Sequence, residues 1–347
     1  MSRARGFRQS MAWLHTWSGL VVGWVLFAIF VTGTASYYRS DISRWMRPEL
    51  SEEAPDPVAA ATRAGVFLRK TMPDAAGWSV KLPNAEASVV EVYWWQNLDG
   101  PYHQALLDPV TGEPARVRDT RGGDFLYRFH FELSLPPIWG RWIVSGCAMI
   151  LLIALISGIV THRRIFADFF TFRRDKSVQR GWLDAHNVMG VLALPFHLMI
   201  VYTGLVTLSS MLMPWGVKAV YGDDLLRYYA EAGLAAPGTG PAGRPGVLLP
   251  LGEIVARASA AGGETPEMLM VTLPGDANAT ATAYFEEPHG LAHLHPQIVY
   301  AAGTGAELAR VSEAGAATRT AAVMAGLHEA HFAAAPLRLV FFLCGVM

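Results

Sequence analysis

The chain contains little cysteine and little charge. Only two cysteines, Cys147 and Cys344, occur among its 347 residues, and both lie within apolar runs. A disulfide scaffold and a Cys-ligated zinc or iron–sulfur centre are therefore excluded. Charged residues make up 16% of the chain, against about 25% in soluble domains, which argues against an ordinary cytosolic enzyme. The net charge of −1 provides no overall basic field for binding nucleic acid.

Long apolar stretches are present instead. Residues 11–38, 138–162 and 183–213 each exceed the about 20 residues needed to cross a hydrocarbon core. A fourth span begins within residues 328–347 and is incomplete. Repeating after His331 the spacing of 32 residues from His130 to His162 leads us to expect a native chain that continues at least about 16 residues beyond Met347. The predicted fold is an α-helical integral membrane protein, a four-span bundle whose fourth span is truncated.

Basic residues predict the orientation of the spans. Arginines precede the first span, and the loop of residues 163–182 after the second span is rich in arginine and lysine. Such segments remain on the cytoplasmic side of a membrane. Residues 39–137 and 214–327 then lie outside, which in a bacterium means the periplasm. The predicted location is a bacterial inner membrane.

The two outer segments resemble each other. Residues 80–95 align with residues 271–286, a helix-like stretch precedes each, and a strand with a tight turn follows each. The first turn is Asp-Pro-Val-Thr-Gly, and the second has Ala-Ala-Gly-Thr-Gly in the same place. We expect each segment to be an α+β domain with one helix packed on a small antiparallel sheet.

The apolar spans repeat as well. His15, Gly19 and Thr32-Gly33 in the first span correspond to His186, Gly190 and Thr203-Gly204 in the third. His130-Phe131 before the second span corresponds to His331-Phe332 before the fourth. The chain therefore reads as span, outer domain, span, written twice, which predicts an internal two-fold axis along the membrane normal.

The histidines form two predicted layers within the membrane. Ionisable residues inside a span are costly and indicate function. If the third span is one straight helix, His197 lies on the same face as His186 and about 16 Å farther out. The candidate ligands are His15, His162 and His186 in the cytoplasmic layer, and His130, His197, His328 and His331 in the outer layer.

Two layers of imidazole suit two b-type haems stacked in a four-helix bundle. Gly19, Gly23, Gly158 and Gly190 would let a flat macrocycle approach the backbone. Zinc is the weaker alternative, because no Cys, Asp or Glu joins these histidines in the membrane. As an alternative to ligation, a histidine at the membrane interface can simply extend its ring to the lipid headgroups. Small residues in a span can likewise contribute to helix packing and not to haem contact.

The pairing of the ligands is partly open. In the cytoplasmic layer, either His15 or His162 is the partner of His186. In the outer layer, His331 is the preferred partner of His197, while His130 could ligate iron or donate a hydrogen bond to a haem propionate. A further group, His289, His293 and His295, is interpreted as a polar loop of the second outer domain rather than a metal site.

The combination of WLHTWSGL, LDPVTGE, RFHFEL, ISGIVTHRRIFADFFTFR, LDAHNVMGVLALPFHLMIVYTGL and LHEAHF resembles the PepSY-associated transmembrane family, in particular its iron-regulated, siderophore-reducing branch. The resemblance extends over essentially the whole chain. It implies four or more spans and two periplasmic PepSY domains. In the reductase branch it also implies two haems that pass electrons outward to a ferric siderophore, which then releases Fe(II).

No nucleotide or flavin fingerprint is present, so the expected electron donor is a quinol or a separate cytoplasmic protein. The alternative function is a transporter or sensor whose PepSY domains bind a ligand without redox chemistry. The presence or absence of haem bands in an absorbance spectrum separates the two.

Overall fold

The computed structural model describes residues 6–50, 55–84, 88–97, 102–162, 177–232, 240–286, 290–312, 314–330 and 332–347. The chain divides into two compact units. Unit 1 contains residues 1–39, 122–214 and 323–347, and unit 2 contains residues 40–121 and 215–322. The predicted domain boundaries remain a prediction.

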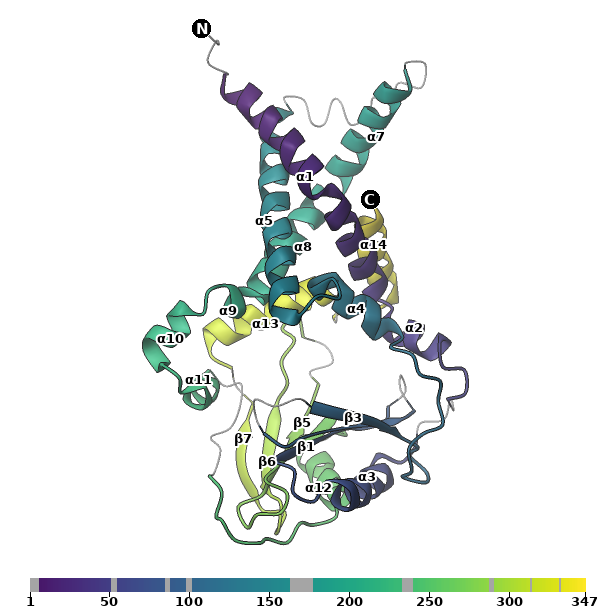
Figure 1. Ribbon diagram of the computed structural model, residues 1–347, viewed down its shortest axis with the longest axis vertical. Helices are drawn as coiled ribbons and strands as arrows, with labels where there is room; N and C mark the ends of the chain where they lie inside the picture. The colour runs from purple at the N-terminus through teal and green to yellow at the C-terminus, as the bar shows by residue number, and fades with distance from the viewer. Residues whose placement is uncertain are drawn as a thin grey trace. The chain divides into compact units, whose positions relative to one another are not determined.

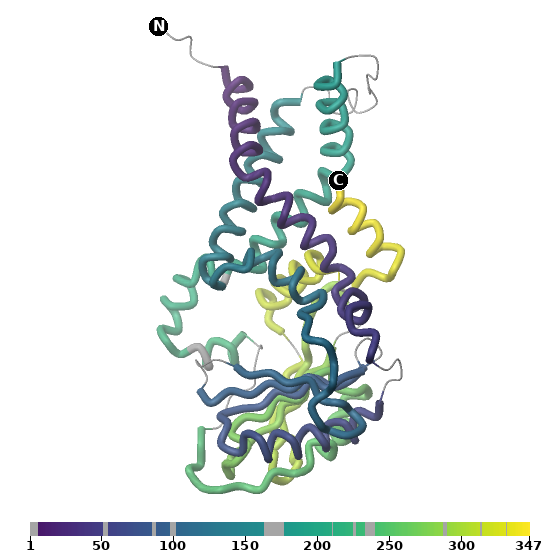
Figure 2. Tube along the Cα trace, turned by 45° about the vertical axis from the view of Figure 1, so that its right-hand side comes forward, coloured from purple at the N-terminus to yellow at the C-terminus, as the bar shows by residue number. Residues whose placement is uncertain are grey.

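The helices of unit 1 are α1 (Phe7–Ser36), α4 (Gly123–Glu132), α5 (Pro137–Thr161), α7 (Val178–Leu192), α8 (Leu194–Thr207), α9 (Ser209–Leu212), α14 (Ala335–Val346) and the end of α13 (Ala316–Glu329). The longest of these helices run lengthwise in Figure 1, whereas α4 and α13 lie across them. Helix α1 packs against α5, α4 and α14, and α5 also packs against α8. Both views show α7 diverging from α1 toward the N-terminal end of α1 (Figures 1 and 2).

Two of the described helices, α1 and α5, are long and apolar enough to cross a membrane. A third crossing exists if α7 and α8 form one broken span. These two helices are bent by 64°, so the prediction of one straight helix over residues 183–213 is wrong, as is the rise of about 16 Å that it implied. The break falls at Ala193, and Pro195 occupies the first turn of α8, where its missing N–H costs nothing. Helix α14 is apolar but has only 12 residues.

The surface of unit 1 carries large apolar side chains. On α1, Leu20, Val21 and Trp24 are 67%, 70% and 85% exposed, and on α5 Ile138 and Trp139 are similarly uncovered. Contiguous apolar surface of this kind is unfavourable in water and suits hydrocarbon. The helices thus satisfy their backbone groups internally and present an apolar exterior to lipid.

Unit 2 contains one seven-stranded antiparallel sheet with helices on one face (Figure 1). Its strands are β1 (Gly77–Lys81), β2 (Val90–Trp95), β3 (Tyr102–Leu107), β4 (Met268–Thr272), β5 (Thr280–Tyr284), β6 (Gln297–Ala301) and β7 (Glu307–Val311), in the order β3-β2-β1-β4-β5-β6-β7. Its helices are α2 (Arg39–Trp45), α3 (Pro57–Thr71), α10 (Trp215–Tyr221), α11 (Leu225–Glu231), α12 (Leu251–Gly262) and most of α13.

The two outer segments contribute to the same sheet. Strand β1 pairs with β4 in antiparallel register, from Gly77 opposite Thr272 to Lys81 opposite Met268. The two small sheets expected from the sequence are therefore joined at their edges. Helices α3 and α12 pack on each other and on this sheet around a buried core that includes Trp78.

The predicted turns are confirmed. After β3, the Asp108 carboxylate accepts hydrogen bonds from the backbone N–H groups of Val110 and Thr111, at 2.9 and 2.8 Å. Gly112 follows with φ of 73°, which only glycine adopts without strain. Gly305, between β6 and β7, has φ of 71° and closes its turn without an aspartate. The N–H donors of Val110 and Thr111 also lower the pKa of the Asp108 carboxyl below its usual value.

Asp276 fixes a second loop in unit 2. Its carboxylate accepts backbone N–H hydrogen bonds from Ala242, Gly243 and Asn278, at 2.9, 2.9 and 2.7 Å. These donors favour the ionised form and lower the pKa of the Asp276 carboxyl below its usual value. Residues 242 and 243 are thereby tied to the connection between β4 and β5.

Candidate functional site

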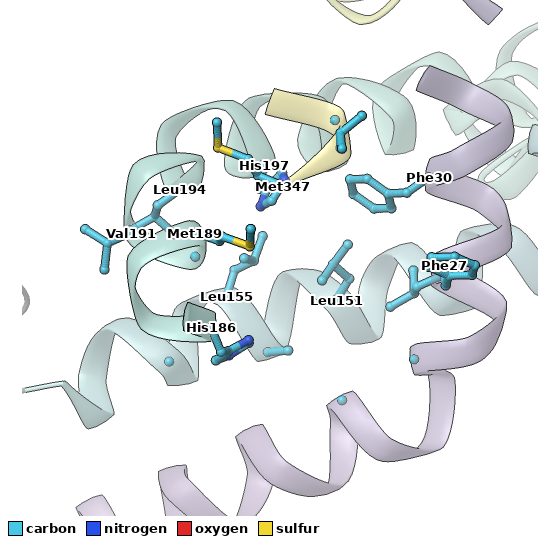
Figure 3. A pocket seen from close by; sticks show the side chains of 18 of the residues that line it. Phe27, Phe30, Leu151, Leu155, His186, Met189, Val191, Leu194, His197 and Met347 are labelled. Atoms are coloured by element: carbon cyan, nitrogen blue, oxygen red, sulfur yellow. The ribbon is translucent and has the colours of Figure 1, made fainter. Parts of the chain in front are cut away.

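A large cavity lies among α1, α5, α7, α8 and α14 of unit 1. Its volume is about 870 Å³, within the range of small-molecule and cofactor sites. Apolar side chains form most of its wall, and the imidazoles of His15, His162, His186 and His197 line it. Figure 3 shows His186 and His197 on the side of α7 and α8, facing Phe27 and Phe30 of α1.

One pair of imidazoles crosses the cavity from α1 to α7. The ring centres of His15 and His186 are 6.2 Å apart, and the ring planes are inclined by 55°. The His15 Nδ1 lies 2.8 Å from the carbonyl oxygen of Ala154 on α5. Because a carbonyl can only accept a hydrogen bond, Nδ1 carries the proton and Nε2 keeps its lone pair. We call His15 and His186 the α1–α7 pair.

A second pair joins α4 and α13. The ring centres of His130 and His328 are 6.0 Å apart, with planes inclined by 37°. The His130 Nδ1 donates to the carbonyl of Ile29 at 2.8 Å, and the His328 Nδ1 donates to the carbonyl of Ile200 at 3.0 Å. Both rings therefore keep Nε2 free of hydrogen. We call His130 and His328 the α4–α13 pair.

The ring-centre separation in both pairs is the one that two imidazoles on a shared haem iron would have. Two rings bound to one iron from opposite faces, with iron–nitrogen bonds of about 2 Å, have ring centres roughly 6 Å apart. Histidine ligands commonly donate their second ring N–H to a carbonyl, which fixes the tautomer and the ring plane. Three of the four imidazoles make this hydrogen bond to the backbone.

Glycines leave open space in the cavity around the α1–α7 pair. Gly19 and Gly23 of α1 and Gly190 of α7 line the cavity, and a Cβ added to any of them would meet no atom within 4 Å. Flat surfaces without side chains accommodate a macrocycle. Gly158 has a different environment, because its added Cβ would lie 3.1 Å from the His15 ring, so this glycine makes room for the His15 imidazole.

The remaining predicted ligands have other surroundings. His197 donates its Nε2–H to the carbonyl of Cys344 at 3.1 Å. Among the described residues, the rings that contact His197 are Phe30 and Phe196 rather than a second imidazole. His162 lines the cavity at the end of α5, but in the part of the chain that the structure describes the ring beside His186 is that of His15. His331 lies outside the described residues.

Unit 2 holds a separate contact between histidines. The rings of His293 and His295 are 4.4 Å apart, and His289 lies outside the described residues. No group of three or more His, Cys, Asp or Glu side chains that could hold a bare metal ion occurs among the residues described. Each imidazole pair provides only two donors, which is too few for a bare metal ion. Two donors suffice for a haem, because its macrocycle supplies the other four nitrogen ligands of the iron.

The sequence did not reveal the carbonyl groups that orient the rings. Ala154, Ile29 and Ile200 contribute only backbone oxygen, so their side chains carry no signal for this role. The sequence did carry a signal for the helix surfaces that the rings contact. Thr32-Gly33 of the first span corresponds to Thr203-Gly204 of the third span, but no contact was assigned to either.

Comparison with known proteins agrees with the interpretation of the apolar helices as membrane spans. The model of the PepSY-associated TM region matches residues 12–347. An uncharacterized protein of Pseudomonas aeruginosa is 27% identical over 126 residues, which is 35% of this chain and 31% of that relative. The chain thus matches less than a third of the relative's length. Because the family model extends over nearly every residue, the chain belongs to the family of the PepSY-associated TM region.

Proposed function

We propose that the protein is a di-haem membrane reductase that passes electrons across a bacterial inner membrane to a ferric siderophore. The observation that supports this most directly is the presence of two imidazole pairs in one helical unit, with ring centres 6.2 and 6.0 Å apart. Membrane helices with pairs of facing histidines are the usual scaffold for b-type haem.

In this proposal, His15 and His186 would hold one haem b, and His130 and His328 would hold the other. The ring-centre separations of 6.2 and 6.0 Å support this assignment. His162 and His197 line the cavity in this assignment and are not ligands, which departs from the pairing of His197 with His331 preferred on sequence grounds. When bound, each haem supplies a one-electron centre whose iron alternates between the ferric and ferrous states.

The chain's own task is to hold, separate and insulate these centres. Along α1, the 14 residues from His15 to Ile29 correspond to a rise of about 21 Å, so the two pairs lie at different depths of the unit. Apolar side chains such as Leu151, Leu155 and Phe27 line the cavity. This apolar lining and the hydrogen bonds to the imidazoles would tune the reduction potential of a bound haem.

Siderophore iron is the substrate. Ferric iron is held tightly by the hard oxygen donors of a siderophore, and Fe(II) is held far less tightly by the same donors. Transfer of one electron therefore suffices for release. The electron donor is a quinol or a cytoplasmic protein, and siderophore reduction takes place on the periplasmic side, where residues 39–137 and 214–327 are assigned by the distribution of arginine and lysine.

An absorbance spectrum of the purified membrane protein tests the proposal. We expect a Soret band, sharp α and β bands on reduction with dithionite, and two haems per chain by pyridine haemochrome assay. Pre-reduced protein should then convert a ferric siderophore to Fe(II) that ferrozine captures. A protein that carries no haem when expressed with excess haem precursor would instead support a ligand-binding or transport function without redox chemistry.

A further inference from the structure

The same five-residue pattern occurs in α1 and α8. It reads Ile29-Phe30-Val31-Thr32-Gly33 in the first helix and Ile200-Val201-Tyr202-Thr203-Gly204 in the second. Each pattern begins 14 residues after a histidine of the α1–α7 pair, His15 or His186. Each also contacts one ring of the α4–α13 pair, because the isoleucine carbonyls accept the Nδ1–H groups of His130 and His328.

The glycine of each pattern makes room for an imidazole. A Cβ added to Gly33 would overlap Nδ1 and Cε1 of His130. A Cβ added to Gly204 would lie 2.8 Å from Cε1 of His328, closer than carbon atoms pack without a shift. Each ring therefore lies directly against the helix backbone, where it reaches a carbonyl that a larger residue would screen. Glycine at these positions is required by the close approach and not by backbone torsion.

The threonine of each pattern is buried, and its hydroxyl lies beside the isoleucine carbonyl that accepts the imidazole N–H. Thr32 donates its hydroxyl to the carbonyl of Ala28 at 2.7 Å, and Thr203 donates to that of Met199 at 2.8 Å. The hydroxyl proton is thereby engaged and the oxygen lone pairs remain available. The Thr203 oxygen lies 3.2 Å from the His328 Nδ1, so this N–H has two acceptors.

We propose that the two Ile-x-x-Thr-Gly patterns form an imidazole clamp, in which Thr32, Gly33, Thr203 and Gly204 position the rings of the α4–α13 pair. The clamp rests on the proposed haem function, and it explains how that pair is preset for iron. Each ring is tied through Nδ1 to a helix, leaving Nε2 as the only nitrogen able to bind a metal. The two helices hold the ring planes 37° apart.

Glycine substitution tests the clamp in the full chain. We expect Gly33→Ala and Gly204→Ala each to lose one of two haems per chain, measured by pyridine haemochrome, together with one low-spin signal in the electron paramagnetic resonance spectrum. The control is Gly146→Ala in α5, because a Cβ at Gly146 meets no atom within 4 Å. This variant should retain both haems and both signals.

A second variant tests ring orientation without adding volume. Thr203→Val keeps the shape of the side chain but removes the hydroxyl acceptor next to His328. Weaker hydrogen bonding at Nδ1 makes the imidazole a poorer electron donor to iron. We expect two haems to remain and the midpoint potential of one to shift upward in a redox titration, while Thr203→Ser keeps the wild-type potential.

The outcomes separate the clamp from the function on which it rests. Wild-type protein with two haems, combined with unchanged haem content, spectra and potentials in Gly33→Ala, Gly204→Ala and Thr203→Val, would overturn the clamp and leave the reductase proposal standing. Wild-type protein without haem would overturn both. Loss of haem in Gly146→Ala as well would show general sensitivity of the helices to substitution and would also overturn the clamp.

Discussion

Helix α1 and the α7–α8 pair carry the same features at the same spacing, yet only α1 is continuous. Each has a histidine of the α1–α7 pair and, 14 residues later, the carbonyl that accepts the Nδ1–H of the α4–α13 pair. Between these points α1 runs without interruption, whereas α7 and α8 are bent by 64°. The position that is Pro195 in α8 corresponds to Trp24 in α1.

This difference makes the two imidazole pairs unequal. Both rings of the α4–α13 pair are tied to carbonyls on helices α1 and α8. In the α1–α7 pair, His15 is tied to the carbonyl of Ala154, and His186 lies on α7, whose main packing partner among the described helices is α8. We therefore infer that the α4–α13 pair is a fixed pair. The α1–α7 pair is an adjustable pair, whose geometry depends on the bend.

Removing a ring of the fixed pair should have the largest effect. Under the proposed haem function, His328→Ala removes one of two iron ligands, so we expect haem to fall from two groups to one per chain and siderophore reduction to be lost. His328→Met is the matched control, because methionine can ligate haem iron and raises its potential. It should retain two haems, with one midpoint potential raised. Full haem content in His328→Ala would show that His331 or another residue is the ligand.

The adjustable pair should respond to His186 and not to His162. We expect His186→Ala to lose one haem and keep the other reducible by dithionite, since His15 alone cannot provide both axial ligands. His162→Ala should keep two haems, because the described ring contact of His186 is with His15. Haem stoichiometry decides the point. Loss of one haem in both His186→Ala and His162→Ala would instead assign His162 as the partner of His186.

Straightening the bend should weaken only the adjustable pair. In a continuous helix Pro195 would lack an N–H and clash with the preceding turn, at about 3 kcal/mol, and Pro195→Ala removes this obstacle to straightening. If α7 then continues the axis of α8, His186 moves away from His15, and we expect roughly tenfold weaker haem retention at that pair. Transfer of haem to apomyoglobin measures this. Equal loss from both pairs would contradict the division into fixed and adjustable pairs.

A change in unit 2 should leave both pairs unaffected and have the smallest effect. The pKa of Asp276 is lower in the folded chain than the about 3.9 of an unfolded one, so ionised Asp276 stabilises the fold above that pH. This contribution disappears as the pH falls through the lowered folded pKa. We expect Asp276→Asn to reduce the Tm of the sheet at pH 7 by circular dichroism, and the difference to narrow below about pH 4. A haem loss in this variant would contradict the separation.

The sequence predicted features that depend on local physics. The apolar length of α1 and α5, the Asp108 turn and the glycine turn at Gly305 each follow from residues close together in the chain. The break at Ala193 was also open to prediction, since Pro195 within a continuous helix conflicts with the carbonyl of residue 191, but the surrounding apolar run was interpreted as one helix.

The pairing of histidines could not be predicted in the same way. The sequence matches His130-Phe131 with His331-Phe332, and His331 lies outside the described residues. Among the described residues, the ring beside Ile200 and opposite His130 is that of His328. That contact depends on where α13 ends, at Glu329, and on which backbone surface Gly204 leaves open. Both are properties of packing in three dimensions, to which spacing along the chain gives no access.

The junction between β1 and β4 has a consequence for biosynthesis. Strand β1 needs β4 as a neighbour, and β4 begins about 190 residues after β1 ends. At about 5–20 residues per second, the edge of β1 remains unpaired for roughly 10 to 40 s while the following helices are synthesised. An open strand edge is a template for misassociation between nascent chains. Lys81, at the end of β1 and ion-paired with Glu267 beside β4 in the finished sheet, places a charge on that edge during the wait.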